Sequence, residues 1–327
     1  MGVRDYAIKR VIQMIPILIG ISILIFGIMY AVPGDPITQR FSLNPNLPPS
    51  EVERMRHNLG LDKPWYIQYG YWLNNVLHLD FGNSYISGEP VTKEIKLRFW
   101  NTMIMQAVAY AISLIIAIPI GVLSAVKQYS KLDNIAMTGA LMGVSMPIFW
   151  FALMAIFLFS LHLGWFPSQG AHGVAFLGKD IPRDTAYYID YIKHLVLPVI
   201  ALAVTFVGFM TRLVRSNMLE VLRQDYIMTA RSKGLKERVV IYKHALRNGL
   251  LPVVTVVGLN IALLIGGAPI TETVFSWPGM GKFYVSALGL RDYPVCMGIL
   301  MMFAVLIVVA NFIVDISYTV LDPRVKY

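Results

Sequence analysis

The fold class is decided by one stretch near the N-terminus, VIQMIPILIGISILIFGIMYAV, residues 11–32. It holds no charged side chain, and it is long enough to cross the hydrocarbon of a bilayer, which needs roughly 20 mainly apolar residues. The whole chain shares this character, because 56% of its 327 residues are hydrophobic and only 14% are charged. Soluble domains carry about 25% charged residues. The sequence therefore predicts an all-α integral membrane protein.

Apolar runs of spanning length recur along the chain. They predict about six spans, at Val11–Val32, Thr102–Val126, Ile135–Leu163, Leu195–Met210, Leu250–Ile270 and Val295–Val320. Several of these runs contain proline, which membrane helices tolerate because neighbouring helices satisfy the freed backbone groups. The first run follows Arg4, Lys9 and Arg10, as a secretory signal peptide would. Its apolar part is too long for a signal peptide and no small-residue cleavage site follows, so we predict a retained anchor.

Basic residues predict the orientation. They precede the first span, follow the second, occur in the C-terminal tail and are most frequent in residues 212–249. The positive-inside rule then places both termini and the 212–249 loop in the cytoplasm. The opposite side holds one large segment, residues 33–101, which is rich in aromatic residues. Ser50-Glu51-Val52-Glu53 is a plausible helix start there, so this segment is predicted to be a folded cap.

Several functions are disfavoured by what the chain lacks. Within the predicted spans the only Asp, Glu, Lys or Arg is Asp315, whereas ion-coupled transporters usually carry such groups near the bilayer midplane. The net charge of +9 does not indicate nucleic-acid binding, because the basic residues lie at the ends of apolar runs. Gly279-Met280-Gly281-Lys282 resembles part of a phosphate-binding loop, but Ser276 and Phe283 break the motif. The single cysteine, Cys296, excludes a disulfide framework.

The 212–249 segment is longer than a connection needs and is patterned. Asp225 is predicted to be the N-cap of a short helix, Tyr226–Lys233, and Gly234 to occupy the left-handed position that ends it. A second helix is predicted over Lys236–Asn248. Two helices joined by a glycine turn can dock into a partner's groove. A solvated basic loop that touches lipid headgroups is equally compatible with this pattern.

Residues 225–235 and 244–248 resemble the EAA loop of the permease subunits of ATP-driven (ABC) importers. Ala230 matches the second alanine of that pattern, Gly234 its glycine and Leu246 its leucine. The chain departs from the pattern at Met228, Thr229, His244 and Arg247.

These departures are similar to one branch, the first permease of dipeptide, oligopeptide and nickel importers. That branch reads close to Thr-Ala-Arg-x-Lys-Gly-Leu and His-Ala-Leu-Arg-Asn in this loop. Further similarity runs in order along nearly the whole chain. It includes Pro33-Gly34-Asp35-Pro36, Leu59-Gly60-Leu61-Asp62-Lys63-Pro64, Asp80-Phe81-Gly82-Asn83-Ser84, Gly164-Trp165-Phe166-Pro167, Glu272–Gly281, Asp292-Tyr293-Pro294 and Leu321-Asp322-Pro323-Arg324.

The resemblance implies a type I importer fold and a division of the chain. Residues 1–32 would form a cytoplasmic stub and the first span, 33–101 an extracytoplasmic segment, 102–321 the permease domain and 322–327 a cytoplasmic tail. It also implies an ATPase-coupling loop. Its residues would be Asp225, Tyr226, Thr229, Ala230, Arg231, Lys233, Gly234 and Leu246.

The resemblance further implies a complex in the plasma (inner) membrane of a prokaryote. A second, homologous permease would complete the pathway, two ATP-binding subunits would hold ATP and Mg, and an extracytoplasmic binding protein would deliver substrate. This chain would then hold no cofactor, catalytic residue or metal, and its own contacts would be with these proteins and membrane lipid. Di- or oligopeptides are the favoured substrates. Nickel, glutathione or another small solute is the alternative, and an ion-coupled transporter or a membrane enzyme or scaffold is a more distant one.

Overall fold

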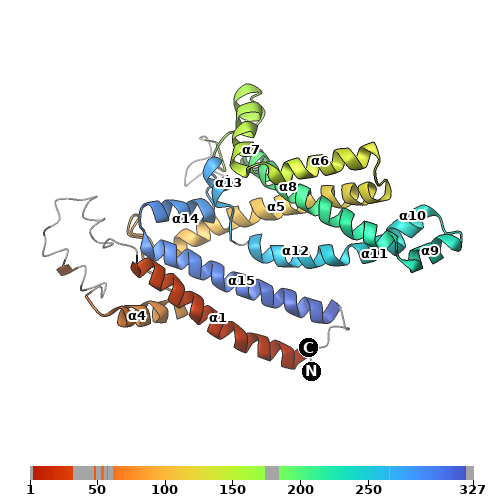
Figure 1. Ribbon diagram of the computed structural model, residues 1–327. Helices are drawn as coiled ribbons and strands as arrows, with labels where there is room; N and C mark the ends of the chain where they lie inside the picture. The colour runs from red at the N-terminus through yellow and green to blue at the C-terminus, as the bar shows by residue number, and fades with distance from the viewer. Residues whose placement is uncertain are drawn as a thin grey trace. The chain divides into compact units, whose positions relative to one another are not determined.

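The computed structural model describes residues 3–31, 48, 53–54, 57, 62–173, 184–264 and 266–321. The helix start predicted at Ser50 and the predicted tail, 322–327, lie outside these ranges, as do the motif residues 33–36 and 59–61. The described chain is helical and contains no strand, apart from an isolated bridge between Asn83 and Pro90. The predicted all-α fold is confirmed (Figure 1).

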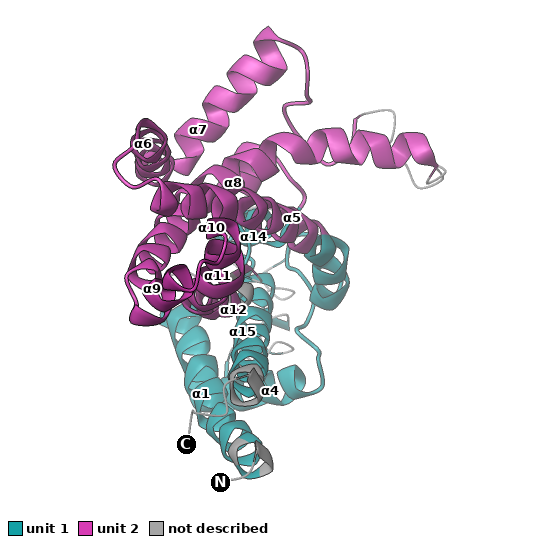
Figure 2. Ribbon diagram, turned by 90° about the vertical axis from the view of Figure 1, so that its right-hand side faces the viewer, with its two compact units in different colours: residues 1–100, 265–269, 279–327 teal, residues 101–264, 270–278 magenta. Residues whose placement is uncertain are grey.

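The chain divides into two compact units, coloured separately in Figure 2. Unit 1 comprises residues 1–100, 265–269 and 279–327, and unit 2 comprises residues 101–264 and 270–278. The helices of unit 1 are α1 (Val3–Ala31), α4 (Trp65–Leu77), the start of α5 (Val91–Val126), α14 (Met280–Gly289) and α15 (Tyr293–Leu321). Unit 2 holds the rest of α5, α6 (Lys131–Ser145), α7 (Ile148–Ala155), the π-helix η1 (Ile156–His162), α8 (Thr185–Leu222), α9 (Asp225–Ser232), α10 (Glu237–Val239), the π-helix η3 (Val240–Ala245), α11 (Leu246–Gly249), α12 (Leu251–Leu264) and α13 (Pro269–Val274).

Four helices of the described chain are long and apolar enough to cross a membrane by themselves. They cover Ala7–Ala31, Val91–Val126, Thr185–Leu222 and Tyr293–Ile316, and so correspond to the first, second, fourth and sixth predicted spans. The fourth is much longer than the predicted Leu195–Met210. Arg212 and Arg215, which were assigned to the cytoplasmic loop, belong to its last turns.

The third predicted span, Ile135–Leu163, was wrong as a single helix. The structure has two helices here, α6 and α7 with η1, which meet at an angle of 101°. The break lies at Met146 and Pro147, whose ψ angles of 127° are extended. Proline donates no backbone hydrogen bond and disfavours the helical conformation of the residue before it. Taken together, the bent pair would make a fifth span.

The fifth predicted span, Leu250–Ile270, was also wrong as one helix. α12 has 14 residues, about 21 Å at 1.5 Å per residue, and therefore falls short of a 30 Å hydrocarbon core. α13 starts only at Pro269, after Gly267 at a φ of +79°. The side-chain amide of Gln106 on α5 donates a hydrogen bond of 2.9 Å to the carbonyl of Leu264, which satisfies a backbone group at the end of α12.

Glycines let the helices of unit 2 approach closely. A Cβ on Gly208 of α8 would lie 2.5 Å from the carbonyl oxygen of Ala140 on α6, and one on Gly121 of α5 would lie 2.7 Å from Val214 of α8. Small residues at such crossings are typical of membrane helix pairs, because backbones can then pack against each other. α5, α6 and α8 are therefore packed through their backbones.

Unit 1 is built on the antiparallel pair of α1 and α15. Arg10 near the start of α1 pairs with Asp315 near the end of α15, with its Nε 2.7 Å from Oδ2. At the opposite end, Ile25 of α1 packs in one cluster with Met301 of α15 and Val76 of α4. These contacts fix the register of the two long helices.

Candidate functional site

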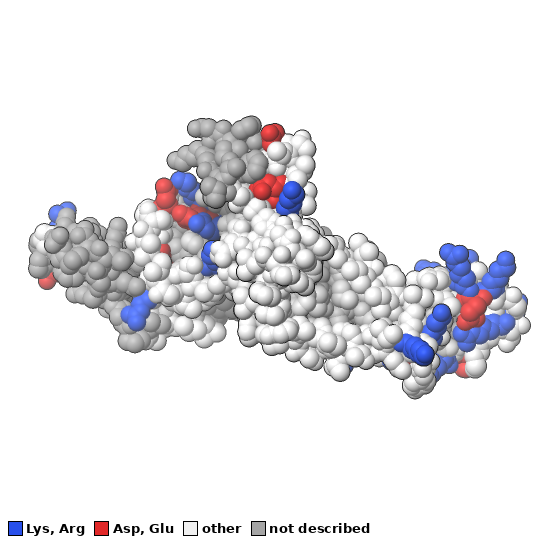
Figure 3. Space-filling model, turned by 90° about the horizontal axis from the view of Figure 1, so that it is seen from above, with Lys and Arg blue, Asp and Glu red and all other residues white. Residues whose placement is uncertain are grey.

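The segment after α8 is the main charged feature of unit 2. α8 ends at Leu222, and the chain then folds into α9, α10, η3 and α11 before α12 begins. Figure 3 shows Lys and Arg side chains gathered over α9 and α10, whereas the neighbouring surface of the long helices is almost uncharged. The predicted pair of helices in this segment is confirmed, with a π-helical stretch inside the second one.

The predicted N-cap of the first helix was wrong by one residue. α9 begins at Asp225, and its N-cap is Gln224, with a ψ of 147° and no side-chain capping bond. The amide groups of Ile227 and Met228 donate to the Gln224 carbonyl, which is therefore the first acceptor of the helix. Asp225 lies in the first turn, where a carboxylate is stabilised by the helix dipole.

The predicted end of this helix is confirmed. Lys233 is the C-cap, and Gly234 follows it with a φ of +72°. The Gly234 amide donates a 2.9 Å hydrogen bond to the Arg231 carbonyl, so the turn is closed by backbone contacts. A Cβ at residue 234 would meet no neighbour within 4 Å. Glycine is therefore favoured here by the left-handed backbone conformation and not by a lack of room for a Cβ.

α9 has an inward face and an outward face. Ile227 and Ala230 are buried in a cluster that also contains Met218 of α8 and Val240 and Ala245 of η3. The outward face exposes Asp225, Tyr226, Met228, Thr229, Arg231, Lys233 and Gly234. Six of the eight predicted coupling residues are therefore accessible. The other two, Ala230 and Leu246, pack against the core cluster.

The segment is also fixed to the helices on either side of it. The Tyr226 hydroxyl accepts a 2.8 Å hydrogen bond from the Asn248 side chain, which joins α9 to α11. At Gly249 of α11 a Cβ would lie 2.6 Å from the sulfur of Met218, so α11 packs directly on α8. α9 is thus held by α8 before it and by α11 after it.

Arg231 and Glu237 form a surface ion pair across the glycine turn. Arg231 Nη2 lies 2.7 Å from Glu237 Oε1, and about half of each side chain is exposed. The hydrogen bond from Arg231 lowers the pKa of Glu237 below its usual value of 4.5. The pair therefore contributes stability above that pH and loses it as the pH falls through the lowered pKa.

Replacing Glu237 is expected to have a small effect. Exposed pairs contribute about 0.2–1 kcal/mol, so Glu237→Gln should lower the thermal unfolding midpoint of the purified protein only slightly at neutral pH. The difference from wild type should vanish once the pH falls below the lowered pKa of Glu237, because the carboxyl group is then protonated and the pair is lost. Glu220→Gln, an exposed change on α8, is the control. A large loss of stability on Glu237→Gln would contradict the assignment of this pair as a surface contact.

Asp133 and Arg215 form a buried ion pair that sequence reasoning missed. Arg215 of α8 donates from Nε and Nη2 to the two oxygens of Asp133 on α6, at 2.7 and 2.8 Å. Asp133 also accepts from the Ser124 hydroxyl of α5 and from the Tyr129 amide, and it is 2% exposed. One carboxylate thus joins α5, α6 and α8, about two turns before α8 ends.

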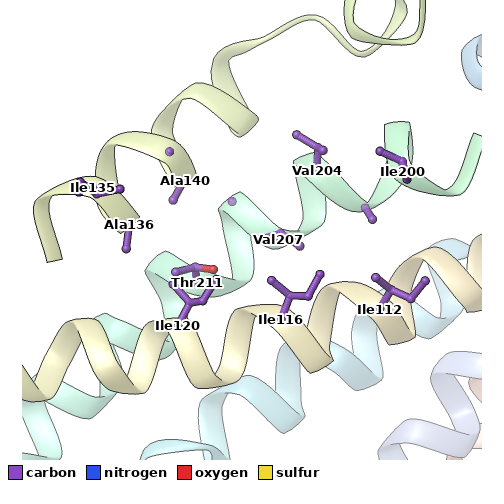
Figure 4. A pocket seen from close by; sticks show the side chains of 13 residues that line it. Ile112, Ile116, Ile120, Ile135, Ala136, Ala140, Ile200, Val204, Val207 and Thr211 are labelled. Carbon is purple, nitrogen blue, oxygen red and sulfur yellow. The ribbon is translucent and has the colours of Figure 1, made fainter. Parts of the chain in front are cut away.

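A groove of about 380 Å³ lies between the same three helices. Figure 4 shows that isoleucines of α5 and α6 and the valines Val204 and Val207 of α8 are among the side chains that line it. Thr211 carries its only side-chain oxygen, and the lining has no charged residue. Such a lining offers nothing that would bind the charged ends of a hydrophilic solute.

Comparison with known proteins identifies the chain. Residues 117–327 match the family described as the inner membrane component of binding-protein-dependent transport systems, and residues 3–107 match its N-terminal companion. The chain belongs to this family of permeases. The predicted resemblance to importer permeases of the peptide type is thereby confirmed.

Relatives cover this permease from end to end. It is 45% identical over 324 residues to the oligopeptide transport system permease protein AppB of Bacillus subtilis (strain 168). The match covers 98% of this chain and 99% of AppB. It is 40% identical over 336 residues to the dipeptide transport system permease protein DppB of Escherichia coli (strain K12), with 99% of each chain covered. Among solved structures, the inward-facing MetNI methionine ABC transporter matches with a TM-score of 0.53 and 18% identity, over 70% of this chain and 96% of that one. This likeness supports the type I importer fold.

Proposed function

We propose that this permease forms half of the pathway of an ATP-driven importer of di- or oligopeptides. A second, homologous permease would form the other half, two ATP-binding subunits would hydrolyse ATP, and an extracytoplasmic binding protein would deliver the peptide. The observation that carries the substrate class is the match over 98–99% of the chain to permeases named for oligopeptide and dipeptide transport. Nickel, glutathione or another small solute is the alternative cargo.

We further propose that α9 is the lever on which the ATP-binding subunits act. Its outward face is accessible, whereas Ile227 and Ala230 anchor its inward face in the core of unit 2. A displacement of α9 would thus be transmitted to α8 through its contact with Met218, and to α12 through α11. For transport, closure of the ATPases must favour one state of the permease, and a complete switch needs about 5.5 kcal/mol.

The proposed topology has both termini in the cytoplasm of a prokaryotic cell, beneath the plasma membrane. The Arg10–Asp315 pair supports it, because it brings the first turns of α1 and the last turns of α15 to the same end of unit 1. The basic residues gathered on α9 and α10 support the same side for the lever.

The described spans favour ATP over an ion gradient as the energy source. Asp133 is paired with Arg215 and Asp315 with Arg10, and each pair lies near the end of its helices. A proton or sodium carrier needs a carboxylate that changes its partner during the cycle. Paired groups at helix ends are better suited to holding helices together.

Peptide-dependent ATP hydrolysis tests the proposed function. The four-subunit complex, reconstituted in lipid, is expected to hydrolyse ATP several-fold faster when its binding protein carries a di- or oligopeptide than when it is empty, because loaded binding protein favours the closed ATPases. Nickel and glutathione are tested in parallel with the same preparation. Stimulation by either of these and not by peptide would overturn the peptide assignment.

A further inference from the structure

We propose that α4 is an interfacial helix embedded in the outer leaflet of the membrane, with phospholipid covering the side that it turns away from α1. The sequence predicted a folded cap in residues 33–101, and α4 is the one long helix described that lies wholly within that segment. Its composition, its contacts and its depth along α1 each support a lipid environment.

The composition of α4 is that of an interface and not of a water-exposed cap. Its 13 residues, WYIQYGYWLNNVL, include two tryptophans and three tyrosines but no charged residue. Tryptophan and tyrosine are enriched where headgroups meet acyl chains, because their rings are apolar and their N–H and O–H groups are polar. A helix that stands in water normally carries charged side chains on its outer face.

The contacts of α4 place it alongside the spanning part of α1. The Tyr69 hydroxyl lies 2.8 Å from the Ser22 hydroxyl, and the rings of Tyr69 and Trp72 lie 5.5 and 5.8 Å from that of Phe26. Val76 packs in the cluster of Ile25. These contacts fix the position of α4 along the axis of α1, beside residues 22–26.

The part of α1 that contacts α4 lies within the hydrocarbon core. Arg10, in its pair with Asp315, marks one boundary of the hydrocarbon, and Ala31 lies about 31 Å further along the helix at 1.5 Å per residue. This equals the thickness of a hydrocarbon core, about 30 Å. Phe26 and Ser22 then lie about 7 and 13 Å below the far boundary. Under the topology proposed above, the far boundary belongs to the outer leaflet.

The side of α4 turned away from α1 is mainly aromatic and aliphatic, and the described part of the chain leaves it uncovered. Tyr66, Tyr71 and Leu77 are 59%, 56% and 74% exposed. Lys63, just before the helix, lies 4.8 Å above the Tyr71 ring and donates to its hydroxyl. A lysine beside a ring at a helix end can extend its ammonium group to the headgroups while the ring stays among acyl chains. Phospholipid suits this surface, because acyl chains can contact its exposed rings and leucine while headgroups can contact its two exposed asparagines.

Site-directed spin labelling tests the proposal, and the chain suits it because its only cysteine, Cys296, is 1% exposed. A nitroxide is placed at Tyr66→Cys on the uncovered side of α4. Ile19→Cys, on the exposed face of α1, is the control within the bilayer, and Ser87→Cys, in the exposed turn before α5, is the control in water. The full complex is reconstituted in vesicles of phosphatidylethanolamine with a minor share of phosphatidylglycerol.

Collisions of the label with oxygen, which partitions into lipid, and with a water-soluble nickel chelate then report its depth. We expect the label at 66 to collide with oxygen several-fold more, and with nickel several-fold less, than the label at 87. Its depth should lie between those of the labels at 87 and 19. Nickel collisions as frequent as those at 87 would overturn the proposal, because α4 would stand in water.

Shielding from both reagents would also overturn it, since a protein and not lipid would then cover α4. Because depth is measured without ATP or peptide, either failure would leave the proposed transport function untouched. Wild-type protein treated with the same spin label supplies the background from Cys296.

Discussion

A Gly234→Val permease is expected to insert into the membrane and to abolish peptide transport. Gly234 has a φ of +72°, a conformation that costs a residue with a Cβ about 1–2 kcal/mol and a β-branched residue more. Since each 1.4 kcal/mol is a factor of ten, the native turn would be reduced at least about tenfold relative to other conformations. The outward face of α9 would then meet the ATP-binding subunits in the wrong orientation.

The matched control for this prediction is Gly234→Asn at the same site. Asparagine adopts the left-handed conformation far more readily than valine, and residue 234 has open space around it. Gly234→Asn should therefore retain most of the transport that Gly234→Val loses, although both add a side chain. The measurements are uptake of labelled peptide and the amount of complex recovered from the membrane. Normal uptake by Gly234→Val would contradict the role assigned to this turn.

An Asp133→Ala permease is expected to be markedly less stable than the wild type. The change removes the acceptor for Arg215, Ser124 and the Tyr129 amide at once, and leaves the Arg215 guanidinium without its partner. Removal of one member of a buried pair costs about 3–5 kcal/mol. The midpoint of thermal unfolding of the purified complex should therefore fall by several degrees.

Two further variants show whether the loss of stability comes from the ion pair or from any substitution in the first turn of α6. Asn134→Ala, an exposed change one residue along the same turn, should alter stability by no more than about 0.5 kcal/mol. Asp133→Asn keeps one acceptor oxygen and should fall between the two. If Asp133→Ala unfolded at the same temperature as Asn134→Ala, the pair would not be joining α5, α6 and α8.

The sequence predicted best those features that depend on local chemistry. Apolar length located α1, α5, α8 and α15, because a spanning helix needs a long uncharged run. The end of α9 at Gly234 followed from the need for a positive φ at a helix C-terminus. The resemblance in the 225–248 loop and along the chain predicted the family that comparison then confirmed.

Features that depend on distant partners were not predictable from the pattern. Asp133 and Arg215 are 82 residues apart, and each was placed outside a span, where a charge needs no partner. Pro147 was treated as a tolerated proline within one helix, although the chain turns by 101° there. Whether a proline bends or breaks a helix depends on the helices packed around it. For α6 and α7, the packed neighbour is α8, which contacts both helices.

Uptake of peptide into proteoliposomes tests whether this permease works with ATP-hydrolysing partners. The complete complex is reconstituted with the ATP-binding subunits facing the lumen, ATP is enclosed there, and binding protein loaded with labelled peptide is added outside. We expect uptake that requires both luminal ATP and binding protein and that persists when ionophores abolish the proton and sodium gradients. Uptake that proceeds without ATP and stops when those gradients are abolished would contradict this expectation.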